Sequence, residues 1–115
     1  MTMLDWNTYR RQVADGVADL ATLSPDTVRG YGAISGAGRK SGHFDEKTRE
    51  LIALAVAVSL RCDGCITVHA DAARKHGATE GELVEALGVA IAVNAGAALV
   101  YSVRTLDAFR ESAKS

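Results

Sequence analysis

The feature that most constrains the fold of this chain is a long apolar run near its C-terminal end, from Ala86 to Tyr101. Almost every residue in the run is apolar, so a helix built from it would have no polar face to turn towards water. A chain of 115 residues has few ways to cover such a helix with its own side chains. We therefore expect part of this helix to be covered by another subunit.

The same apolar run does not predict a membrane span. It is interrupted by Gly88, Asn94 and Gly96, and it falls short of the roughly 20 apolar residues that a spanning helix needs. The N-terminal segment also lacks the basic start and apolar core of a signal peptide. We therefore expect a cytoplasmic protein that binds no membrane.

The composition favours a helical protein without a nucleic-acid partner. The chain carries 13 Lys and Arg residues against 14 Asp and Glu residues. This balance disfavours a general basic field that would attract nucleic acid. Proline occurs once, alanine is abundant and an alternating strand pattern is hard to find, which together predict an all-α fold.

The N-terminal third shows two helix signals of different strength. Apolar residues from Trp6 to Leu20 recur at helical spacing and form one stripe. Ser24 and Pro25 then form a helix start, with serine at the cap and proline at the first helical position. Because several glycines follow, this second helix should be short, and a flexible linker that ends near Gly42 and His43 should follow it.

The remaining residues predict four more helices, which makes about six in a compact fold. The run Leu51–Leu60 has little polar face and predicts a buried helix. Residues 62–76 predict the next helix, and Thr79 with Glu82 forms a capping box that opens another. The segment Asn94–Gly96 is expected to divide the apolar run, so that a last helix follows it.

The candidate functional site combines both cysteines with a histidine, as Cys62, Cys65 and His69. On a helix these residues lie at i, i+3 and i+7, so they share one face. The two thiols would be about 5–6 Å apart at Cβ, close enough to form a disulfide after modest adjustment. A helix N-terminus favours the reactive thiolate, and His69 could exchange a proton with Cys65. This spacing suits a dithiol reaction cycle.

Two other interpretations of the same three side chains stay open. They could bind zinc, with a fourth ligand from His43, His76 or Glu50. Structural zinc sites usually bring a second pair of ligands, however, and the chain has no third cysteine. The cysteines could also simply pack in the core. The residues alone favour redox chemistry over zinc binding, and zinc binding over packing.

The motif Glu50 followed by Cys62-x-x-Cys65-x-x-x-His69 resembles the alkylhydroperoxidase D / carboxymuconolactone decarboxylase family. The resemblance covers roughly residues 43–103. It includes flanking segments on both sides of the motif, at Lys47–Val56, Gly77–Thr79 and Glu82–Ala86. It leads us to divide the single domain into an N-terminal helical segment, residues 1–42, and an alkylhydroperoxidase D-like helical core, residues 43–112.

The resemblance implies a cofactor-free peroxidase that assembles as a homotrimer or homohexamer. Cys65 would match the peroxidatic thiol, which a hydroperoxide oxidises to a sulfenic acid. Cys62 would match the resolving thiol and proton donor, which closes a disulfide. Glu50 and His69 would match the proton relay, and a dithiol partner of lipoyl or thioredoxin type would reopen the disulfide.

One departure from the family pattern lies between the cysteines. Some alkylhydroperoxidase D members have a second histidine just before the second cysteine, where this chain has Gly64. The departure predicts a weaker peroxidase or a different substrate. The decarboxylase branch generally lacks the cysteine pair. Acid–base chemistry by Glu50 and His69 on a lactone is therefore the first alternative, and a non-enzymatic helical oligomer that binds zinc is the second.

Overall fold

The computed structural model describes residues 2–114, and within that range the chain is all-α, as predicted. It forms five helices: α1 (Trp6–Leu23), α2 (Pro25–Ser41), α3 (Glu46–Leu60), α4 (Asp63–Lys75) and α5 (Glu80–Ser112). The number is five rather than about six because the expected break at Asn94–Gly96 does not occur. The side-chain amide of Asn94 donates to the Ala90 carbonyl at 2.7 Å, and a helical glycine costs only about 1 kcal/mol.

The expectation of a short second helix followed by a linker is also wrong. Helix α2 has 17 residues and includes the glycine-rich segment up to Ser41. Pro25 begins the helix, Asp26 lies in its first turn and Arg39 lies in its last turn, so both charges suit the helix dipole. The helix ends at Gly42, whose φ of 70° is the left-handed conformation that glycine adopts readily.

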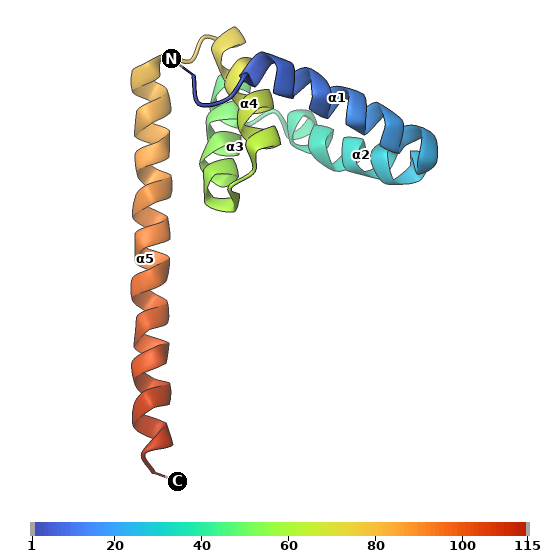
Figure 1. The fold of residues 1–115 in the computed structure, drawn as a ribbon. Coiled ribbons are helices and arrows are strands. Elements are labelled where there is room, and N and C mark those ends of the chain that lie inside the picture. Colours follow the sequence, from blue (N-terminus) through green and yellow to red (C-terminus); the bar gives the residue numbers. More distant parts are fainter. Residues whose placement is uncertain (1, 115) are drawn as a thin grey trace.

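The helices pack as an open row in the order α2, α1, α4, α3, α5, and within residues 2–114 their backbones approach closely only between neighbours in that row. Figure 1 shows α1 and α2 as an arm on one side of the α3–α4 pair, with α5 on the other side. The radius of gyration is 18.8 Å, whereas a compact domain of this length has roughly 13 Å. The single chain is therefore more extended than a compact domain of its length.

The small core lies where α3 meets α4 and α5. Its buried apolar side chains are Leu54, Ala57, Ala73 and Ala90. Two polar residues, Glu50 and Thr67, are equally buried. Glu50 bonds to His69 between α3 and α4, and Thr67 bonds to Trp6 between α4 and α1. This part of the fold therefore holds polar groups in fixed positions rather than only burying apolar area.

Helix α5 runs parallel to α3 and then continues beyond it. Lys47 pairs with Glu82 at 2.7 Å near the start of both helices, and Asn94 donates to the Ser59 hydroxyl at 2.7 Å near the end of α3. The helix then extends away from the other four (Figure 1). Its exposed large apolar side chains are Val84, Val89, Ile91, Val93, Leu99, Val100, Tyr101, Val103, Leu106 and Phe109.

By length and composition, α5 is the one described helix that could cross a membrane. A single helix of this kind is weak evidence for a span, because core helices of soluble proteins meet the same criteria. Its exposed apolar surface does agree with the expectation that the chain alone cannot cover this helix.

Candidate functional site

The site begins at the tight connection between α3 and α4. Arg61 ends α3 in the left-handed conformation, with φ 55° and ψ 49°. Cys62 follows as the N-cap of α4, and its Sγ accepts a hydrogen bond from the Cys65 amide at 3.1 Å. Cys62 and Cys65 form a disulfide with a Cα–Cα distance of 5.2 Å. The first turn of α4 therefore holds both sulfur atoms at the positive end of the helix dipole.

A buried carboxylate orients the histidine of the motif. Nδ1–H of His69 donates to Oε2 of Glu50 at 2.6 Å, across the contact between α4 and α3. Glu50 is only 5% exposed, whereas the His69 side chain is 32% exposed. Because the carboxylate accepts from Nδ1–H, the other ring nitrogen, Nε2, is left free to accept a proton.

Arg39 supplies a second charged contact to this carboxylate. Its Nη2 lies 4.0 Å from Oε1 of Glu50, and its Nε donates to Glu46 at 3.1 Å. Sequence reasoning missed Arg39 because it assigned this segment to a linker. The signal that could have found it is a basic residue in the last turn of a helix that begins at Pro25.

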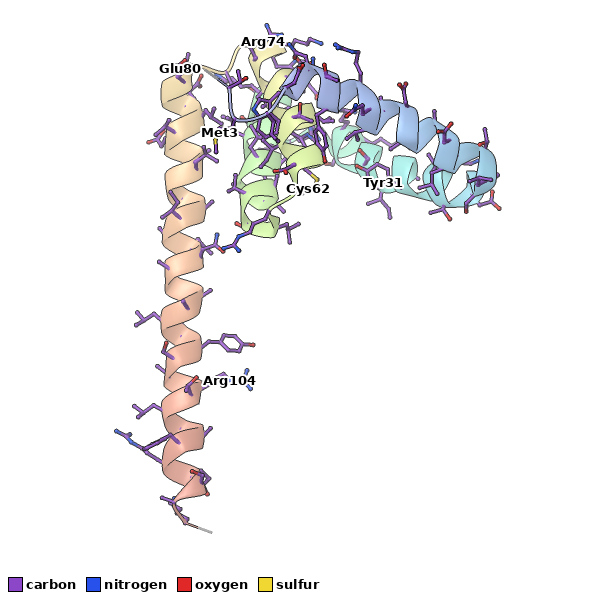
Figure 2. The ribbon with its side chains drawn as sticks, in the orientation of Figure 1. Met3, Tyr31, Cys62, Arg74, Glu80 and Arg104 are labelled. Atoms are coloured by element: carbon purple, nitrogen blue, oxygen red, sulfur yellow. A yellow bond between two sulfur atoms is a disulfide. The ribbon has the colours of Figure 1, made fainter. Side chains whose placement is uncertain are left out.

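The three motif residues line one cleft, as their helical spacing predicts. The cleft has a volume of about 500 Å³ and lies between α1 and α4. Helix α4 contributes Cys62, Cys65 and His69, whereas α1 contributes Arg10 and several apolar side chains. The hydroxyl of Thr67 donates to the Trp6 carbonyl at 3.1 Å, which fixes α1 against α4. Figure 2 shows Cys62 at the start of α4, with Tyr31, which also lines the cleft, on the arm.

The departure at Gly64 coincides with the contact between α4 and α1. A Cβ built on Gly64 would lie 3.7 Å from Cγ2 of Val13, which is an ordinary contact distance. A longer side chain at this position would have to extend into the space that α1 lines. The absence of a second histidine is thus accompanied by an apolar wall beside the cysteines.

The other histidines lie outside this arrangement. His43 is in the connection between α2 and α3, and His76 caps the C-terminus of α4. Among residues 2–114 there is no group of three or more His, Cys, Asp or Glu side chains placed to hold a metal ion.

Comparison with known families gives a match over most of the chain. The family model of the carboxymuconolactone decarboxylase family matches residues 25–108. The chain belongs to the carboxymuconolactone decarboxylase family. The predicted resemblance is confirmed, although the match begins within α2 rather than near residue 43.

Relatives of this carboxymuconolactone decarboxylase family protein agree in sequence and fold. An uncharacterized protein of Haemophilus influenzae is 46% identical over 105 residues, which cover 91% of this chain and 93% of the relative. The crystal structure of a carboxymuconolactone decarboxylase family protein from Legionella pneumophila is 35% identical. It matches with a TM-score of 0.73, over 92% of this chain and 95% of that one. A protein of Methanobacterium thermoautotrophicum matches at 34% identity with a TM-score of 0.67, covering 73% of this chain and 94% of that one.

Proposed function

We propose that this family member is a thiol-dependent hydroperoxidase, or a closely related disulfide oxidoreductase. The observation that carries the proposal is the Cys62–Cys65 disulfide in the same cleft as His69, whose ring is oriented by Glu50. A disulfide within one helical turn is the expected product of a dithiol reaction cycle. No cofactor is needed, because sulfur carries the electrons.

The first step would oxidise Cys65. Its thiolate attacks the terminal oxygen of a hydroperoxide, so an S–O bond forms as the O–O bond breaks. The other oxygen leaves as an alcohol after taking up a proton. In the reduced protein, His69 would accept the thiol proton of Cys65 at Nε2, and Glu50 would stabilise the resulting imidazolium. The sulfur becomes a sulfenic acid.

The second step would close the disulfide, and a reductant would then reopen it. The Cys62 sulfur attacks the sulfenic sulfur of Cys65, and the hydroxyl leaves as water. A dithiol partner of lipoyl or thioredoxin type donates two electrons and two protons by thiol–disulfide exchange. We propose the cytoplasm as the compartment, because thiol pools there keep cysteine pairs reduced between cycles.

Activity measurements on cysteine variants test this proposal. The wild-type protein should reduce an alkyl hydroperoxide at the expense of a dithiol, and Cys65→Ser should abolish the reaction. Cys62→Ser should retain a single oxidation of Cys65 but lose turnover with the dithiol. Hydroperoxide reduction that survives Cys65→Ser would contradict the proposal.

The Glu50–His69 hydrogen bond favours one alternative function, which is acid–base chemistry on a lactone. This pair is complete without the cysteines, because a carboxylate-oriented imidazole can move protons by itself. Such an activity would be unchanged after both thiols of the reduced protein are alkylated. The peroxidase activity would be lost, so one alkylation experiment separates the two candidates.

We also propose that the protein works as a homotrimer or homohexamer. The support is the extended shape of the single chain and the apolar surface of α5. Burying one such apolar side chain contributes roughly 1.5–3 kcal/mol, so a few of them would stabilise an interface between subunits.

A further inference from the structure

The cleft beside the disulfide is larger and more apolar than a small peroxide needs. Its volume of about 500 Å³ falls within the range of sites that bind small organic molecules. Val13 and Val17 of α1, Val68 of α4 and Tyr31 of α2 contribute to its walls. A ligand with an apolar body would displace water from these side chains, which favours its binding.

One cationic side chain, Arg10, lines this otherwise apolar cleft. Its side chain is 30% exposed, and two contacts hold it in place. Its Nη2 donates to Oδ1 of Asn7 at 3.0 Å, and its Nε lies 3.8 Å from Oδ2 of Asp71. Among residues 2–114, Nη1 of Arg10 donates no hydrogen bond. The guanidinium is therefore held in place, and its Nη1 group can still donate hydrogen bonds to a ligand.

Asp71 does not neutralise the positive charge at this end of the cleft. It also pairs with Arg74 at 3.1 Å and with Lys75 at 2.8 Å. Hydrogen bonds from Lys75 and then Arg74 lower the pKa of Asp71, so it stays ionised at neutral pH. Three cations thus share one carboxylate, and none of them has another ion-pair partner in the described part of the chain. Of these three cations Arg10 is the one that lines the cleft, so its charge is the one available to an anion there.

We propose that the cleft binds organic hydroperoxides that carry a carboxylate, with the carboxylate at Arg10 and the apolar body between α1 and α4. A guanidinium suits a carboxylate because two parallel N–H groups can donate to its two oxygens. The peroxide group would then face Cys65 and His69 in the same cleft. The reaction converts a hydroperoxy acid and the protein dithiol into a hydroxy acid, water and the Cys62–Cys65 disulfide.

This inference rests on the proposed peroxidase function, and its test separates the two. The probes are a straight-chain fatty acid hydroperoxide and its methyl ester, which share the same chain and peroxide group. The acid is ionised at its carboxyl end at neutral pH, whereas the ester is neutral there. We expect kcat/KM of the wild-type protein to be at least about tenfold higher for the acid, because hydrogen bonds to charged groups are the strong ones. This comparison needs no variant and so does not depend on a variant folding.

Variants then assign the preference to Arg10. Arg10→Gln should lower kcat/KM for the acid by about 10- to 100-fold and leave that for the ester within about twofold. Arg10→Lys should give an intermediate preference, because it keeps the charge but loses the planar fork. The matched control is Arg11→Gln, on the exposed neighbour whose guanidinium donates to Thr8. It should change kcat/KM for neither the acid nor the ester.

Equal rates for acid and ester in the wild-type protein, with both reactions dependent on Cys65, would overturn the inference and leave the proposed function intact. A preference that survives Arg10→Gln would also overturn it. If no hydroperoxide oxidises the cysteines, the proposed function fails and this inference fails with it.

Discussion

The α3–α4 pair and the second half of α5 use their side chains in different ways. Between α3 and α4, the hydrogen bond from His69 to Glu50 joins residues 19 apart in sequence, and Glu50 is 5% exposed. Beyond Asn94, the hydroxyls of Ser102 and Thr105 donate only to carbonyls of their own helix. Leu99 and Phe109, in the same half of α5, are 71% and 74% exposed.

The difference indicates that one chain supplies all the side chains that the proposed cycle needs. The same chain leaves much of its apolar surface exposed. All groups that the proposed cycle uses lie on α3, on α4 or at the N-cap of α4. Helix α5 carries more of the exposed large apolar side chains than any other helix, so we expect a second subunit to cover it. Substitutions in the two regions should therefore affect different measurements, and the four below run from the largest expected effect to the smallest.

Replacing Glu50 by glutamine should slow the oxidation of Cys65 strongly without changing the assembly. Glutamine cannot stabilise an imidazolium as a carboxylate does, so we expect the rate to fall by about 10²-fold. The measurement is stopped-flow oxidation of the reduced protein by an alkyl hydroperoxide. The matched control is Glu85→Gln, on an exposed glutamate of α5, which should stay within about twofold. Equal rates for the two variants would remove Glu50 from the relay.

Placing two charges on the exposed half of α5 should disrupt the assembly without affecting the disulfide. Leu99 and Val103 are four residues apart and lie on one face of the helix. We expect Leu99→Glu with Val103→Glu to reduce the mass in light scattering to that of a single chain, because the interface would have to bury unpaired carboxylates. Thr105→Glu, on a different face, is the control. A wild-type protein that is monomeric at micromolar concentration would contradict the account.

Replacing Gly96 on α5 by alanine tests whether the space beside this glycine is open or is filled by a second subunit. A Cβ on Gly96 would meet nothing within 4 Å, and the same holds for Gly36 on α2. In a helix with open space around it, alanine is more stable than glycine by about 1 kcal/mol. We expect Gly36→Ala to be stabilising in urea unfolding, but Gly96→Ala to be destabilising, because small residues permit close approach of helices. Equal stabilisation by both would indicate that no helix approaches Gly96.

The smallest expected effect is the acid sensitivity of the α3 N-cap. Hydrogen bonds from Thr48 lower the pKa of Asp45 below 3.8 in the folded state. Its contribution to stability is therefore fully present above that value and is lost as the pH falls through the folded-state pKa. Asp45→Asn keeps an N-cap acceptor but cannot titrate. Between pH 5 and pH 3, urea unfolding should show a smaller loss of stability for the variant, and equal losses would exclude this role.

Much of the site could be predicted because its determinants are local. Helical spacing places Cys62, Cys65 and His69 on one face, and the Thr79–Glu82 capping box is confirmed by hydrogen bonds of 3.1 and 3.0 Å. The roles of the individual site residues stay predictions. The part that sequence could not supply is long-range, because spacing within one helix does not say which other helix covers it.

The arm shows where that limit lies. The apolar stripe that begins at Trp6 predicts a packing helix, yet nothing in its spacing places Arg10 beside the cysteines. The glycines in α2 and in α5 predict breaks, but neighbouring hydrogen bonds and helix ends outweigh a cost of about 1 kcal/mol per glycine. Both errors arise from weighing a local propensity without the tertiary contacts that override it.

The most direct test of the central claim is intact mass spectrometry of the fully reduced protein after brief exposure to one equivalent of an alkyl hydroperoxide. The account predicts a loss of two hydrogens per chain without covalent dimers, and peptide mapping that assigns the bond to Cys62 and Cys65. A chain whose thiols stay unchanged, or one that accumulates a sulfinic acid at Cys65 with Cys62 still free, would contradict it.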